Sequence, residues 1–103
     1  MSAIHIHRSH QLGLPQARDI ARQWASKAER KFDLRCHYLS GESQDTVRFE
    51  RAGIQGTLQV HADQFELAAQ LGFLFSAFAP RIEAEIAAQI DQLLQAQSKA
   101  PLA

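Results

Sequence analysis

Three histidines near the start of the chain are the residues whose type and spacing come closest to a metal site. His5 and His7 are two positions apart, so on a strand their imidazoles point the same way and could chelate one ion. A firm site needs a third or fourth ligand, and His10 is expected to lie beyond the end of that strand. Polar residues on a solvent-facing strand are the favoured interpretation, so the sequence predicts no metal and no other cofactor.

The candidate nucleophiles have no base positioned beside them. Cys36 and His37 are adjacent on a predicted strand, where neighbouring side chains point to opposite faces. We therefore expect the thiol to be a small buried apolar group. The remaining candidates share one predicted polar turn: Ser40, Glu42, Ser43 and Asp45. A hydroxyl without a base is a poor nucleophile, so the sequence predicts that the protein is not an enzyme.

One helix carries a basic face that could contact phosphates. Its residues are Arg18, Arg22, Lys27, Arg30 and Lys31. Such a face is more often simply solvated, and the aromatic residues that single-strand binders place between their cations are missing. Eleven basic residues balance eleven acidic ones over the whole chain. No nucleic-acid partner is therefore expected, although the face stays a possible contact surface.

A charge-free apolar segment near residue 75 is the most distinctive feature of the sequence. Its large side chains are Phe73, Leu74, Phe75 and Phe78. Some of them are expected to cap the core, but four such groups in six residues cannot all face inward from one turn or loop. An exposed remainder is typical of a surface that contacts a partner, a second copy or a lipid-like body. Ile82 and Ile86, on the helix that follows, complete the predicted contact surface.

Hydrophobic periodicity predicts the elements that must position these residues. Strands are expected over 3–8, 34–38, 47–51, 57–61 and 65–71, and helices over 15–32 and 80–97. The order β-α-β-β-β-β-α indicates an α+β fold in which both helices pack on one face of an antiparallel sheet. We expect one domain over residues 1–98 and a flexible tail over residues 99–103.

The last predicted helix is amphipathic. Its apolar stripe comprises Ile82, Ile86, Ile90, Leu93 and Leu94. The residues expected to face away from that stripe are Glu83, Glu85, Gln89 and Gln92. This stripe is predicted to cover the sheet or to form a dimer seam.

Length and cysteine content bound the class of protein. The chain has 103 residues and one cysteine, which excludes an intramolecular disulfide and fits a reducing compartment. No apolar run approaches the ~20 residues that span a bilayer, and the first residues lack the apolar core of a signal peptide. The sequence therefore predicts a cytoplasmic protein.

An ordered set of motifs covers nearly the whole chain. The motifs are His10-x-Leu12-Gly13 with Ala17-Arg18, Asp45-x-Val47-x-Phe49-x-Arg51-x-Gly53-Ile54-x-Gly56, Leu71-Gly72-x-Leu74, and Ile82-Glu83-x-Glu85-Ile86 with Asp91-x-Leu93-Leu94. Together they resemble one known family, the small polyhydroxyalkanoic acid system proteins. The resemblance implies a bacterial protein of a polyester storage system and supplies no catalytic residues. It favours a binding or regulatory role at or near a polyhydroxyalkanoate granule, with the granule surface, a granule-coating protein or a second copy as partner.

Two alternatives stay open from the sequence. The element order and the segment Lys27-x-Glu29-Arg30-x-Phe32-Asp33 are similar to ribosome hibernation factors, which would imply ribosomal RNA as the partner. The neutral charge balance disfavours that assignment. A carrier of small hydrophobic ligands is the other alternative, and it would require an open apolar cavity between sheet and helices.

Overall fold

The alternating and helical patterns form five strands, two long helices and one short helix in the computed structural model, which describes residues 2–98. In chain order these are β1 (Ser2–Ser9), α1 (Leu14–Phe32), β2 (Arg35–Leu39), β3 (Asp45–Arg51), β4 (Ile54–Val60), β5 (Gln64–Leu71), α2 (Phe73–Ser76) and α3 (Ala79–Ser98). The predicted α+β class and the order β-α-β-β-β-β-α are confirmed, with the single turn α2 as an addition. The tail expected over 99–103 lies outside the described residues.

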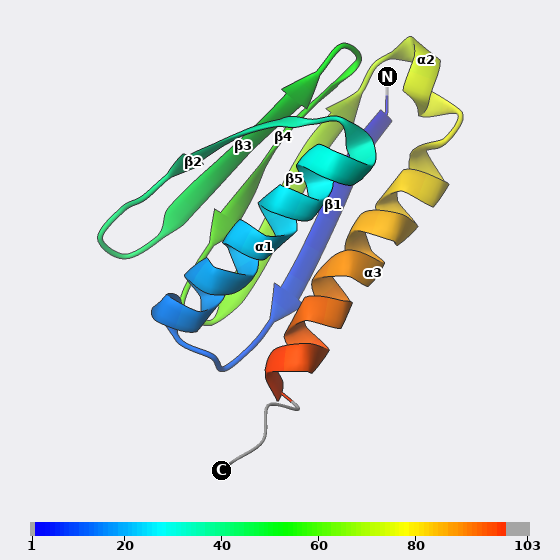
Figure 1. The fold of residues 1–103 in the computed structure, drawn as a ribbon. Helices are drawn as coiled ribbons and strands as arrows, with labels where there is room; N and C mark the ends of the chain where they lie inside the picture. The colour runs from blue at the N-terminus through cyan, green and yellow to red at the C-terminus, as the bar shows by residue number, and fades with distance from the viewer. Residues whose placement is uncertain (1, 99–103) are drawn as a thin grey trace.

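The sheet is antiparallel throughout, in the order β1-β5-β4-β3-β2. Strands β2 to β5 form a meander of hairpins, while β1 pairs with β5 at one edge. The chain therefore crosses the whole sheet between β1 and β2, and α1 makes that crossing. Figure 1 shows α1 and α3 side by side on the same face of the sheet. Over residues 2–98 the opposite face carries no helix.

Every second strand residue points toward the helices and forms the core, as the period of two requires. Small residues on α1, among them Ala17, Ala21 and Ala28, are fully buried and bring the helix close to the sheet. Trp24 fills the space between them, and its ring meets that of Phe49 edge-on at a centroid distance of 5.4 Å. The core is thus one contiguous layer between the sheet and the two helices.

Helix α3 follows the predicted stripe with one correction. Ile86, Ile90 and Leu93 are buried as expected, but Gln89 is also buried, with 8% of its surface exposed. The expectation that Gln89 faces away was wrong because it lies three residues after Ile86 and four before Leu93, on the same side of the helix. Asp91 fastens the helix to β1: its Oδ1 lies 2.7 Å from Nε of Arg8.

Candidate functional site

The α2 patch consists of Phe73, Leu74 and Phe78, which are 90%, 78% and 54% exposed. Helix α2 begins directly after Gly72, where β5 ends, and Ser76 Oγ donates a hydrogen bond of 3.0 Å back to the Gly72 carbonyl. Successive residues of a single helical turn point about 100° apart, so only part of the turn can face the protein. The apolar remainder anticipated from the sequence is therefore on the surface.

Phe75 is the member of that segment that turns inward. Its ring lies against the turn between β3 and β4, where a Cβ on Gly53 would come within 2.9 Å of Phe75 Cδ2. The guanidinium carbon of Arg51 stands 5.3 Å from the centre of the same ring. Of the two predicted contact residues on α3, Ile82 is half-buried and Ile86 is 3% exposed. Ile86 therefore belongs to the core, and Phe75 anchors the segment.

An apolar cavity of about 330 Å³ opens beside the anchored segment, between the end of α1 and the start of α3. We call it the α1–α3 groove. Its floor consists of core side chains, namely Leu34, Phe49, Leu71 and Ile86, and its walls are Phe32, Ile54, Phe75, Phe78 and Ile82. The charged residues along it are Lys31, Arg51, Arg81 and Glu85. Three separate parts of the chain supply the cations.

Arg51 and Arg81 have N–H donors that form no hydrogen bond with the described residues. Arg51 donates one hydrogen bond, from Nη1 to the Phe32 carbonyl at 2.9 Å, out of the five N–H groups of a guanidinium. Arg81 Nε lies 3.6 Å from Glu85 Oε1, and the Arg81 side chain is 79% exposed. This separation exceeds hydrogen-bond distance, so the pair is a loose surface contact.

The predicted basic face of α1 divides into two parts. Arg18 turns toward the β2–β3 turn, where its Nε lies 2.9 Å from Asp45 Oδ2 and its Nη2 donates to the Gly41 carbonyl at 2.5 Å. Arg22 stacks over Tyr38, with 5.1 Å between the guanidinium carbon and the ring centre. Arg30 and Lys31 are exposed at the end of the helix, and Lys27 is half-buried. The two N-terminal arginines are therefore engaged in holding the fold.

Asp45 corrects the assignment of this carboxylate to the polar turn. It is the first residue of β3, its side chain is fully buried, and it accepts hydrogen bonds from the Tyr38 hydroxyl and from the Gly41 N–H at 2.9 Å. Burial raises the pKa of Asp45, but the bonds from Tyr38, Gly41 and Arg18 outweigh it, and the pKa lies below its ordinary value. The signal was present in the sequence, because Asp45 shares the strand phase of Val47 and Phe49.

The three N-terminal histidines do not converge on one point. His5 and His7 lie on the face of the sheet without helices, and His7 Nε2 is 2.7 Å from Gln64 Oε1. His10 instead accepts a hydrogen bond from the Leu12 N–H at Nδ1, and its ring stacks at 4.7 Å on Phe65, which faces the helices. Over residues 2–98 the structure contains no group of three or more potential ligands close enough to hold a metal ion.

Cys36 and His37 occupy opposite faces of the sheet, as the strand geometry predicts. The thiol contacts the Ala25 carbonyl at 3.7 Å, and burial, with a contribution from Glu29, raises the pKa of Cys36 to about 11. His37 points to the open face, with Nε2 4.0 Å from Glu50 Oε1. A protonated thiol without a base has little nucleophilic character near neutral pH.

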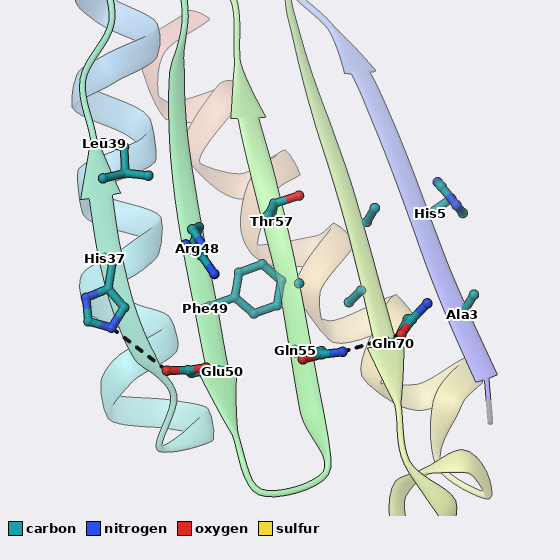
Figure 2. A pocket seen from close by; sticks show the side chains of 13 residues that line it. Ala3, His5, His37, Leu39, Arg48, Phe49, Glu50, Gln55, Thr57 and Gln70 are labelled. Carbon is teal, nitrogen blue, oxygen red and sulfur yellow. Dashed lines mark hydrogen bonds and ion pairs between the residues drawn. The ribbon is translucent and has the colours of Figure 1, made fainter.

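The open face of the sheet carries a shallow hollow of about 720 Å³ that sequence reasoning did not single out (Figure 2). Small residues form part of its lining, among them Ala3, Gly56 and Ala68. Its larger lining residues are His5, His37, Leu39, Arg48, Glu50, Gln55, Thr57 and Gln70. The ring of Phe49 reaches the hollow beside Gly56, where any Cβ would lie 2.6 Å from Phe49 Cζ. Both acidic and basic groups line this face, so it has no dominant charge.

Comparison with known proteins yields one family. A model described as "Putative polyhydroxyalkanoic acid system protein" matches residues 4–94. Neither the curated proteins nor the solved structures contain a match. Within the part of the chain that the structure describes, no helix is both long enough and apolar enough to cross a membrane.

Proposed function

This chain belongs to the polyhydroxyalkanoic acid system protein family, and from that premise we propose that it is a non-enzymatic binding protein that acts at polyhydroxyalkanoate storage granules in the cytoplasm. The observation that carries the proposal is the exposure of the α2 patch, whose first two residues are 90% and 78% exposed. A storage polyester presents an apolar surface, and exposed apolar side chains are what such a surface attracts.

The patch is built for contact with an extended surface. Phe73 and Leu74 project from a one-turn helix that the inward-facing Phe75 anchors to the β3–β4 turn. No charged residue occurs between Leu67 and Pro80, so the segment can approach an apolar body without desolvating a charge of its own. Burial of each large apolar side chain contributes roughly 1.5–3 kcal/mol, enough for two of them to drive adsorption.

The partner in this proposal is the polyester itself. A granule-coating protein or a second copy of the chain would use the same exposed side chains, so the experiment has to separate the three. Bare polyester particles carry no coating protein, and dimerisation can be followed in the absence of any particle. The decisive comparison is therefore between native granules, bare particles and protein alone.

Co-sedimentation of the full chain with each particle tests the proposal. The variant Phe73→Ser/Leu74→Ser removes the two most exposed side chains and leaves the anchor Phe75 in place. The matched control is Leu39→Ser, which removes an apolar side chain that is 51% exposed on β2. Wild type and control should partition onto bare polyester particles, and the patch variant should partition at least about tenfold less, as a loss of 1.4 kcal/mol or more requires.

Three results would contradict the proposal. Equal partitioning of the patch variant and wild type would remove the patch as the contact surface. Binding of wild type to native granules but not to bare particles would make a coating protein the partner. A concentration-dependent dimer in size-exclusion chromatography that the patch substitution abolishes, without particle binding, would assign the patch to a second copy.

A further inference from the structure

We propose that the α1–α3 groove binds a small amphipathic anion, an aliphatic carboxylate with a single chain, whose chain lies on the apolar floor and whose carboxylate meets the cations Lys31, Arg51 and Arg81. The inference goes beyond the granule proposal and does not depend on it. Phe73 and Leu74, the two patch residues that the granule experiment changes, do not line the groove, whereas Phe78 of the patch forms part of its wall.

The floor of the groove is formed by the hydrophobic core. Its floor side chains are 1–5% exposed and belong to the core of the fold. The half-buried Phe32, Ile54 and Ile82 rise around them as walls. A ligand chain lying there would contact core residues rather than the outer surface, which is the usual arrangement of a small-molecule site.

The size of the groove limits the ligand. A volume of about 330 Å³ lies at the lower end of the range of small-molecule sites. At about 30 Å³ for each water-sized group it holds roughly ten such groups, which corresponds to one chain of about ten carbons. Two-chain lipids are larger than this space.

The charges select the head group. Among the described residues, the groove is lined by three cations, Lys31, Arg51 and Arg81, and by one acidic residue, Glu85. Over the whole chain eleven basic residues balance eleven acidic ones, so this excess of positive charge is local. Arg51 has donors left after its bond to the Phe32 carbonyl, and Arg81 is held only loosely by Glu85. A guanidinium offers paired donors to a planar carboxylate, which makes a carboxylate the best-matched anion.

A titration of the full chain with decanoate, below the concentration at which it forms micelles, tests the site. Calorimetry measures the affinity, and amide NMR shifts locate the ligand. Saturable binding is expected, with shifts concentrated at Phe32, Ile54 and Ile82. Decyltrimethylammonium has the same chain length and the opposite charge, so it should bind at least about tenfold more weakly. Hexanoate should also bind more weakly because it leaves part of the floor uncovered.

Arg81→Glu reverses an exposed charge at the groove without removing a core contact. It should weaken decanoate binding at least about tenfold, while Arg48→Gln, on the opposite face of the sheet, should leave it unchanged. Arg51→Gln is a second test, and its thermal melt shows whether the loss of the Arg51–Phe75 contact has disturbed the fold. Absence of saturable decanoate binding overturns the proposal. So does equal binding of the cationic detergent, or an Arg81→Glu variant that binds like wild type.

The two proposals fail separately. Phe73→Ser/Leu74→Ser should lose particle adsorption and keep decanoate binding, and Arg81→Glu should show the reverse pattern. A patch variant that loses both would mean that one surface performs both roles, and the groove would then not be an independent site.

Discussion

The ring of Phe75 lies in the space that a side chain on Gly53 would occupy. A Cβ at residue 53 would stand 2.9 Å from Phe75 Cδ2, and the backbone φ of Gly53 is +88°. The turn between β3 and β4 therefore requires glycine at residue 53 for two reasons. The backbone there is left-handed, and a side chain would collide with Phe75. The carbonyl of Gly53 also accepts a 2.8 Å hydrogen bond from the Gly72 N–H, just before α2. The packing of Phe75 against Gly53 determines which side of α2 faces solvent.

Gly53→Ala should destabilise the fold through both effects. The left-handed backbone alone costs a side chain about 1–2 kcal/mol, and displacement of Phe75 adds to it. A double-mutant cycle with Phe75→Ala, measured by urea unfolding, separates the two. Gly53→Ala should cost at least about 0.5 kcal/mol less when residue 75 is Ala, because the ring is then gone. An additive cycle would mean that the contact contributes nothing.

Asp45→Asn should destabilise the fold and flatten its dependence on acid. Hydrogen bonds to a charged group contribute about 1.5–3 kcal/mol, so the loss near neutral pH should be about that large. Because the folded pKa of Asp45 lies below its ordinary 3.8, the unfolded chain binds more protons in the window between the two. The stabilisation is complete above the ordinary value and is lost as pH falls through that window.

Urea unfolding from about pH 6 down to about pH 3 measures this slope, since the window lies below the ordinary carboxyl pKa. Asp19→Asn, an exposed carboxylate on α1, is the matched control. The difference in slope between the two variants isolates the buried network. Identical slopes in wild type and Asp45→Asn would refute the assignment.

His10 should give the protein a second pH dependence, nearer neutrality. Burial, which outweighs the nearby Asp63 carboxylate, lowers the pKa of His10 below its ordinary 6.5. The unfolded chain then binds more protons below pH 6.5, so stability is complete above that pH and falls as the pH drops toward the folded pKa. His10→Asn keeps an acceptor for the Leu12 N–H but does not titrate. Its unfolding free energy should change less between about pH 7 and pH 5 than that of wild type.

Gln89→Leu should stabilise the fold. The side chain is 8% exposed, and its Oε1 has no hydrogen-bond partner among the described residues. An unsatisfied buried polar group costs about 1–3 kcal/mol, so replacement by an apolar residue of similar size should raise the free energy of unfolding by about 1 kcal/mol. Thermal unfolding measures the gain. Gln92→Leu, at an exposed position on the same helix, should be close to neutral, and an equal gain in both variants would indicate helix propensity rather than burial.

The alternation of apolar residues determined most of the fold. It placed all five strands within a few residues and showed that residues such as Cys36 and His37 face opposite ways, because a strand's side-chain period is set by its own backbone. The helical period likewise located α1 and α3. The crowding of apolar residues over 73–78 showed that some must be exposed, since one helical turn cannot bury them all.

Only the tertiary structure decided which polar groups are buried and which distant residues share a site. Asp45 and Gln89 are in phase with buried apolar residues on their own elements, but each side chain is polar, and only the elements that pack over them bury them. The α1–α3 groove joins Lys31, Arg51 and Arg81, which lie on three different elements. Local periodicity sets the direction of a side chain relative to its own backbone. The approach of separate elements depends on how two helices pack across one sheet, and no local pattern encodes that.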